Sequence, residues 1–326
     1  MCDIADIGRS RYRAAYVTIA PMRRLMTSGL LLATACGARL SGNPTEVDRP
    51  DAMGAADAPM PDMAPDAAPL RPWSTPAKVG PAATTAVEDD VTLSSDALEM
   101  IFAVQVTNTT TKDLYYTSRT AIGAPWTMPA VKVPFDTAAS EEAPRFSGDA
   151  RTLYFASDRA TAGNLDIYAV TRPTAGSTAW GTPIPATGAI NTTATEKWFA
   201  PCTGGHYVVV RGTGTSGTTH LFEGMTGVAP TAIASLNSPT ADDTGAFLTQ
   251  DCLTIYFASF RTTPERIFTS HRAAIGDSWP APTEVDDFKI GTGTDNQEDP
   301  WLSPGGNTFV FASNAAGNKD IYLSTR

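Results

Sequence analysis

The stretch TLYFASDRATAGNLDIYAVTR, residues 152–172, decides the fold. It predicts two β-strands, TLYFAS and DIYAVT, because apolar, aromatic and β-branched residues fill both runs and a polar turn with Gly and Asn separates them. Nearly the same phrase returns as TIYFASFRTTPERIFTSHR from Thr254 and as TFVFASNAAGNKDIYLSTR from Thr308. A segment that recurs with its spacing intact indicates one structural unit that has been copied.

Five copies of this unit can be aligned, and each opens on acidic residues. The best-matched pair is EEAPRFSGDARTLYFASDR from Glu141 and DDTGAFLTQDCLTIYFASFR from Asp242, and the other copies begin at Glu88, Glu196 and Glu298. The starts fall about 45 to 56 residues apart, which is the size of one four-stranded propeller blade.

The fourth strand of a copy begins with Trp and contains Pro, as in WTMPAVKV from Trp126 and WPAPTEV from Trp279. Because Pro cannot donate to a ladder, this strand must be the outer edge of the blade. The last copy ends at Arg326 without such a strand, whereas WSTPAKV begins at Trp73, ahead of the first copy. We therefore predict an all-β fold, a five-bladed β-propeller of four-stranded antiparallel blades, whose ring closes when residues 73–79 join the last blade.

The copy that begins at Glu141 resembles the WD40-like repeat of TolB-type propellers. The resemblance is carried by Ser147, Asp149, Leu153, Tyr154, Phe155, Ala156, Ser157, Asp158, Arg159, Asp166, Ile167 and Tyr168. It spans roughly residues 73–326 and implies the propeller fold, with many different roles among exported proteins. From the residues themselves we also expect Arg159 to pair with Asp166 across the turn.

Residues 1–35 are predicted to be an export signal. From Met22, the predicted true start, the chain reads MRRLMTSGLLLATAC, with two arginines, an apolar run and small residues before Cys36. Residues 33–36 resemble the lipobox of bacterial lipoproteins, which implies cleavage before Cys36 and diacylation of that cysteine. Gly37 implies, by the same resemblance, the outer membrane. The alternative is an ordinary cleaved signal without a lipid.

Residues 36–69 are rich in Pro, Ala and Asp and contain no aromatic residue, so they are predicted to be a disordered tether that leaves residues 70–326 as the propeller. The chain carries 34 acidic and 24 basic side chains, a net charge of −10. A surface of this sign repels phosphate backbones, which excludes nucleic acid as a partner. We expect a monomer that contacts the membrane through its lipid anchor.

Cys202 and Cys252 remain once Cys2 and Cys36 are assigned to the leader and to the lipid. Both stand at the same turn of neighbouring copies, in a chain expected in an oxidising compartment. This placement predicts a disulfide between them. Two free thiols packed as small apolar groups are the alternative.

The acid that opens each copy is the main candidate for ligand or cation binding. These five residues are Asp89, Glu142, Glu196, Asp243 and Glu298. Because the first strand of a blade lines the central channel, their carboxylates would form a ring at one mouth, where they would raise one another's pKa or recruit a cation. Ca²⁺ is the one cofactor that such a ring suggests. The alternative is that each acid caps a turn of its own blade.

The leading hypothesis for function is non-enzymatic, and no catalytic residue is predicted. The sequence contains no Gly-x-Ser-x-Gly elbow, and a rigid ring with short loops favours recognition of an envelope protein or polysaccharide. The alternative is a carbohydrate-binding or glycan-cleaving propeller. It would use paired carboxylates such as Glu142 and Glu298, with Trp198 and Trp301 as sugar platforms.

Overall fold

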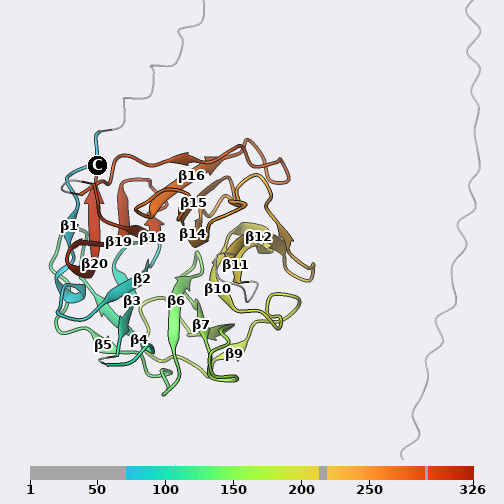
Figure 1. Cartoon of the computed structure of the whole chain (residues 1–326). Coiled ribbons are helices and arrows are strands. Elements are labelled where there is room, and N and C mark those ends of the chain that lie inside the picture. The colour runs from blue at the N-terminus through green and yellow to red at the C-terminus, as the bar shows by residue number, and fades with distance from the viewer. Residues whose placement is uncertain (1–70, 107, 213–218, 291–292) are drawn as a thin grey trace, which may run out of the picture. The chain divides into compact units, whose positions relative to one another are not determined.

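A computed structural model describes residues 71–106, 108–212, 219–290 and 293–326 (Figure 1). In these residues the chain forms five four-stranded antiparallel sheets and two short 3₁₀ turns, η1 (Gly80–Ala82) and η2 (Thr203–Gly205). The predicted all-β, five-bladed propeller is therefore confirmed. The predicted signal, Cys36 and the tether lie outside the described residues. The described part has no helix that is long and apolar enough to span a membrane.

The first three blades follow the order of the chain, from the inner strand outward. Blade 1 comprises β2 (Glu88–Leu93), β3 (Glu99–Gln105), β4 (Lys112–Ser118) and β5 (Val131–Lys132). Blade 2 comprises β6 (Glu141–Phe146), β7 (Thr152–Ser157), β8 (Asp166–Thr171) and β9 (Ile184–Pro185). Blade 3 comprises β10 (Glu196–Pro201), β11 (His206–Gly212), β12 (Thr219–Met225) and β13 (Thr231–Ala232).

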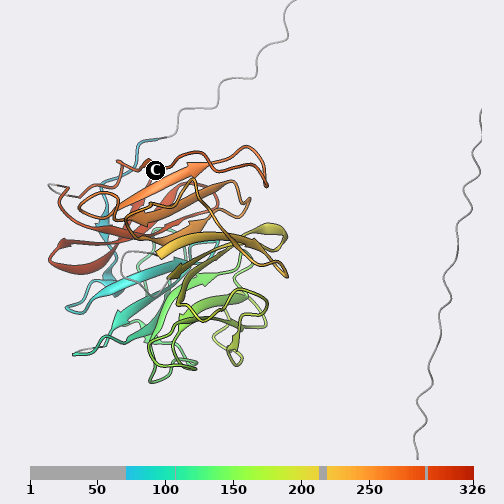
Figure 2. The same ribbon diagram turned by 45° about the vertical axis from the view of Figure 1, so that its right-hand side comes forward.

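The last two blades complete the ring. Blade 4 comprises β14 (Asp243–Leu248), β15 (Thr254–Ser259), β16 (Arg266–His271) and β17 (Thr283–Glu284). Blade 5 comprises β18 (Gln297–Leu302), β19 (Thr308–Ala316), β20 (Asn318–Thr325) and the amino-terminal strand β1 (Ala77–Lys78). Pairing of β1 with β20 confirms the predicted closure, and the five inner strands contact one another in ring order (Figures 1 and 2).

The repeated phrase is explained by packing within and between blades. In four blades an aromatic residue of the second strand lies opposite one of the third, as Phe155 lies opposite Tyr168 with ring centroids 6.0 Å apart. Phe155 is fully buried and belongs to an apolar cluster shared by blades 1 and 2. Five such clusters fill the spaces between blades. Each copy therefore needs its neighbours to cover both of its faces.

The Trp of the fourth strand also has a repeated partner. An Arg at the end of the third strand lies over the Trp ring, at 4.4 Å for Arg119 and Trp126 and at 4.1 Å for Arg272 and Trp279. The closing strand repeats this contact, since the guanidinium of the carboxyl-terminal residue lies 4.4 Å from the Trp73 ring centroid. A cation over an indole face is attracted by the ring quadrupole. The same contact therefore fastens β1 to blade 5.

A bulge interrupts each inner strand at the same place. In β2, for example, the register shifts by one residue between Asp89 and Thr92, and all five inner strands show this shift. The third residue of every inner strand has a positive φ, from 49° to 54°; these residues are Asp90, Ala143, Trp198, Gly245 and Asp299. A bulge of this kind redirects the side chains beside it. Here it brings side chains of five blades together at the ring axis.

Candidate functional site

The inner strands place their second residue at one mouth of the channel. Ladder register makes five residues equivalent, each opposite the same position of the second strand: Asp89, Glu142, Lys197, Thr244 and Glu298. Three of these five positions are the ones predicted from the sequence. Lys197 and Thr244 were not predicted, because an acid stands one residue earlier in those two copies.

Glu196 and Asp243 therefore do not join a five-carboxylate ring, and that prediction is corrected. Both occupy the first position of their strand and are fully buried. Glu196 accepts from Nε of Arg211 at 2.8 Å, and Asp243 accepts from Nη2 of Arg261 at 2.6 Å, each within its own blade. These two acids therefore follow the alternative stated above, in which each acid binds within its own blade and does not meet the others.

An ion pair of the same kind shows that the expected partner of Arg159 was wrong. Its Nη2 donates to Glu141 at 3.0 Å, at the first position of blade 2, and its guanidinium lies 5.0 Å from the Tyr168 ring centroid. Asp166 instead lies opposite Ser157 in the ladder. The Arg of the repeated phrase thus anchors the inner strand rather than the turn.

A second set of side chains reaches the mouth from the start of the third strand. In blades 1, 4 and 5, Lys112, Glu265 and Lys319 each stand directly before the residue that pairs with one equivalent position of the second strand. The sequence carries a signal for them, since each stands directly before the pattern Asp/Arg-Leu/Ile-aromatic. We define the mouth cluster as these three residues together with Asp89, Asp90, Glu142, Lys197, Glu298 and Asp299.

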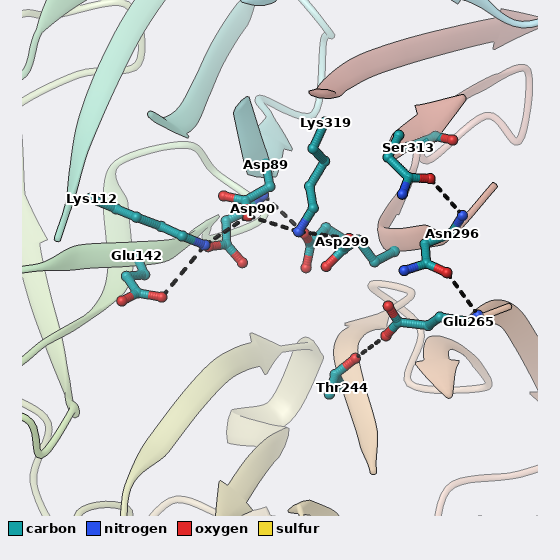
Figure 3. A network of polar contacts seen from close by, with 12 residues as sticks. Asp89, Asp90, Lys112, Glu142, Thr244, Glu265, Asn296, Asp299, Ser313 and Lys319 are labelled. Atoms are coloured by element: carbon teal, nitrogen blue, oxygen red, sulfur yellow. Dashed lines mark hydrogen bonds and ion pairs between the residues drawn. The ribbon is translucent and has the colours of Figure 1, made fainter. Parts of the chain in front are cut away.

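Lysines bridge the carboxylates of the mouth cluster (Figure 3). Nζ of Lys112 lies 2.7 Å from Asp89, 3.0 Å from Asp90 and 3.7 Å from Glu142. Nζ of Lys197 lies 2.6 Å from Glu142 and 3.3 Å from Asp90. Charges of both signs are thus fixed by several ion pairs, which are stronger here than at an open surface because the groups are mostly buried.

The third lysine extends the network toward blade 5. Nζ of Lys319 lies 2.7 Å from Glu298 and 3.2 Å from Asp89, so Asp89 is shared by lysines from two blades. Figure 3 shows Lys112 and Lys319 approaching the acids from opposite sides. The cluster is a network rather than a set of separate pairs.

Trp198 closes the channel beneath the cluster. Its indole Nε1 donates to Asp90 at 2.9 Å and to Asp299 at 2.8 Å, and the backbone N–H of Asp90 donates to Asp299 at 3.0 Å. Gly245 completes this layer, because a Cβ there would stand 2.8 Å from the backbone nitrogen of Asp299. The side chains at the axis therefore fill the channel at this level.

Burial and the neighbouring charges shift the pKa values of the cluster's acids in both directions. Although burial opposes ionisation, Lys197 and Lys112 hold the pKa of Glu142 below its usual range, and Lys112 and Lys197 do the same for Asp90. Burial and the neighbouring Asp90 charge raise the pKa of Asp299 well above its usual range. Burial and the charge of Glu298 raise the pKa of Glu265 to about 8. Glu265 therefore carries a proton at neutral pH.

A pocket of about 290 Å³ opens over the cluster on the side of blade 4. We call it the mouth pocket. It is lined by Asp89, Lys112, Lys197, Trp198, Thr244, Phe260, Glu265, Asn296, Glu298 and Lys319. Phe260 is 48% exposed and stands at the rim. The pocket thus offers acceptors, ammonium donors and one exposed aromatic ring.

The carboxylates near the mouth include one group that is close enough to hold a cation. Oxygens of Asp89, Glu298 and Asp299 lie within 4.8 Å of one another, and oxygen is the ligand that Ca²⁺ prefers. The lysines already pair with Asp89 and Glu298, so an ion there would compete with ammonium groups. Calcium binding stays a prediction.

Cys202 and Cys252 lie across the boundary of blades 3 and 4. Their Sγ atoms are 1.96 Å apart and their Cα atoms 5.5 Å apart, as a disulfide places them. Cys252 is fully buried and packs in the apolar cluster that these blades share. The bridge thus links two neighbouring blades near the turns between their first and second strands.

Comparison with known proteins shows similarity at the level of fold. The chain matches no family model and no curated sequence. Among solved structures it is similar to the catalytic domain of the Coprinopsis cinerea GH62 α-L-arabinofuranosidase, with a TM-score of 0.53 and 14% identity over 78% of this chain and 96% of that one. The Podospora anserina α-L-arabinofuranosidase gives 0.53 and 13% over the same shares.

A TolB-type propeller also stands among the similar structures. The putative TolB of Agrobacterium tumefaciens gives a TM-score of 0.47 and 17% identity over 74% of this chain and 77% of that one. The likeness is one of fold. At such low identities, proteins with unrelated functions share a propeller, so the function must be argued from the site.

Proposed function

We propose that the protein is a non-catalytic recognition scaffold of the cell envelope and that the mouth pocket is its ligand-binding site. The proposal is supported chiefly by the pairing of the mouth carboxylates with three lysines, which fixes groups of both charge signs around a pocket open to solvent. Preorganised donors and acceptors bind a polar ligand with little ordering cost.

The same pairing argues against catalysis by Glu142. Two lysines hold this carboxylate, and its pKa is below the usual range. A base of low pKa accepts a proton poorly near neutral pH. The mouth pocket is also slightly smaller than the roughly 300 to 1,000 Å³ of pockets for drug-sized ligands. It suits one side chain of an envelope protein or one unit of a polysaccharide.

The proposal includes export and attachment to the outer membrane through Cys36. The signal-like pattern that ends at Cys36 and the tether-like composition of residues 36–69 support it. In the native cell, the wild-type chain should fractionate with membranes, and mass spectrometry should find acyl groups on Cys36. A Cys36→Ser chain that fractionates with membranes as the wild type does would contradict the anchor.

The binding site is tested by equilibrium binding of a chain that starts at Leu70 to separated protein and polysaccharide fractions of the envelope. Phe260→Ala removes the exposed ring at the pocket rim, and Ile184→Ala is the matched control, since Ile184 is 60% exposed on the outer strand β9. Loss of one aromatic contact, roughly 0.5 to 1.5 kcal/mol, should weaken binding about 2- to 12-fold. Equal binding by both variants would place the ligand elsewhere.

Glycan cleavage is a second candidate because of Glu265. A carboxyl that keeps its proton at neutral pH is suited to act as a general acid, and the charge of Glu298 acts on it. Envelope polysaccharide incubated with the wild-type chain should release no reducing ends if the scaffold proposal is correct. Release that Glu265→Gln abolishes would establish cleavage instead.

A further inference from the structure

Arg145 crosses the ring axis at the end of the inner strands that lies away from the mouth. It extends from β6 in blade 2, and its Nη2 donates to the backbone oxygen of Ala246 in blade 4 at 3.1 Å. Its Cζ lies 5.2 Å from the ring centroid of Phe247, also in blade 4. Blades 2 and 4 are not neighbours, so the guanidinium stands in the central channel.

Most donors of this buried guanidinium have no partner. Arg145 is 4% exposed, and its Nε and Nη1 make no hydrogen bond to the residues that the structure describes. No carboxylate of that part of the chain lies within ion-pair distance of it, and Asp299 and Asp90 act on it only at longer range. Burial lowers the pKa of Arg145 to about 10, so it remains a cation at neutral pH. An unpaired buried cation is strongly destabilising unless an anion accompanies it.

The free donors have the geometry of a carboxylate site. A guanidinium presents two edges, each with two parallel N–H groups, and Nη2 contributes one hydrogen to each edge. Whichever hydrogen Nη2 gives to Ala246, one edge of Arg145 keeps both of its donors. Such an edge binds a carboxylate through two parallel hydrogen bonds.

A pocket of about 240 Å³ opens on Arg145 from this side. We call it the arginine pocket. Phe247, Trp301 and Leu93 supply apolar walls, and Asp251 stands at the exposed rim. The arginine pocket shares no lining residue with the mouth pocket.

We propose that the arginine pocket binds a small monocarboxylate with an apolar body, held by the free edge of Arg145. One guanidinium neutralises one negative charge, and Arg145 is the one cationic side chain among the described residues that line the arginine pocket, so a second negative charge would have no counter-charge. The carboxylate at the rim, Asp251, further disfavours dianions. Phe247 and Trp301 offer aromatic faces for the body of the ligand. This site is additional to the recognition proposed at the mouth.

The test is calorimetric titration of the full chain with benzoate, with benzamide as the neutral ligand of the same shape and inorganic phosphate as the polyvalent anion. Benzoate should bind at millimolar or lower concentration, and benzamide and phosphate should each bind at least tenfold more weakly. Arg145→Met keeps the length of the side chain without its charge and should weaken benzoate binding at least tenfold. Arg145→Lys should bind weakly as well, because an ammonium lacks the fork.

Three results would overturn the proposal. Benzamide that binds as well as benzoate would show that the charge is not recognised, and tighter binding of phosphate would assign the site to another class of anion. Benzoate binding that persists in a folded Arg145→Met chain would place the ligand elsewhere. If that variant does not fold, the comparison of benzoate with benzamide on the wild-type chain decides the question.

Discussion

Closure of the ring by β1 can be tested by substitution of Trp73. Its ring centroid lies 5.2 Å from that of Phe288 and 6.0 Å from that of Phe309, both edge-to-face, and Arg326 covers its face at 4.4 Å. Two aromatic pairs at about 0.5 to 1.5 kcal/mol each and one cation–π contact at about 0.5 to 1 kcal/mol give about 1.5 to 4 kcal/mol. Trp73→Ala should therefore lower the free energy of unfolding by about 3 kcal/mol.

Trp126→Ala is the matched control. Trp126 is half-buried, as Trp73 is, and has the same Arg contact, at 4.4 Å from Arg119. It lies in blade 1, however, whose strands are continuous in the chain. Its removal should lower the free energy of unfolding by only about 1 to 2 kcal/mol. Urea unfolding followed by far-ultraviolet circular dichroism measures both, since this signal comes mainly from the backbone amides.

Hydrogen exchange supplies the readout that is specific to closure. Val79 donates to the backbone oxygen of Ile321 at 2.9 Å, and Ser74 donates to that of Thr325 at 2.7 Å. In the Trp73→Ala chain the amides of Val79 and Ser74 should lose protection, and in the Trp126→Ala chain they should keep it. Equal losses of stability, or unchanged protection of these amides, would refute the view that Trp73 fastens the ring.

Three further outcomes follow from the same contacts. Removing the bridge by Cys202→Ser and Cys252→Ser should lower the free energy of unfolding by about 4 kcal/mol, since it closes a loop of 50 residues; equal unfolding midpoints with and without reductant would contradict this. Gly245→Ala should lower the free energy of unfolding by about 1 to 3 kcal/mol, because φ is +54° and the new Cβ would meet the backbone of Asp299. Thermal unfolding measures this change. Glu265→Gln should be more stable than the wild type at high pH but not at low pH, measured by urea unfolding at pH 5 and pH 9.

The sign of the Glu265 effect follows from its raised pKa. The folded chain holds this proton more tightly than the unfolded chain, so stability falls as the pH rises from 4.5 to about 8 and is level above that. The upper bound is about 5 kcal/mol, at about 1.4 kcal/mol per pKa unit. A wild-type chain with the same pH profile of stability as Glu265→Gln would contradict the assignment.

The control for Gly245→Ala is Gly305→Ala, whose new Cβ would have ordinary contacts at 3.8 Å.

The sequence was sufficient to predict the four-stranded blade and the strand that closes the ring. Phe155, Tyr168 and Trp73 fill equivalent positions in a repeated packing arrangement, and repetition makes such positions visible without a structure. The closing strand could be predicted because its Trp-Pro phrase was missing from the last copy and present ahead of the first.

The site was only partly predictable, because a shift of one residue exchanges an inward for an outward side chain. An acid opens every aligned copy, but Glu196 and Asp243 precede the bulge by one position more than Asp89 does. Two lysines of the mouth cluster, Lys112 and Lys319, come from the third strands of blades 1 and 5 and not from the inner strands. These lysines reach carboxylates of other blades only because the ring closes, and no local sequence pattern shows which side chains the closed ring brings together.

The measurement that tests the central claim most directly is hydrogen exchange of the chain from Leu70 with and without the bound envelope fraction. Recognition at the mouth should slow the exchange of residues 260–265 and 296–298, which border the mouth pocket, and should leave the outer strands β9 and β17 unchanged. Protection confined to outer strands, with residues 260–265 unaffected, would contradict the assignment of the mouth pocket as the binding site.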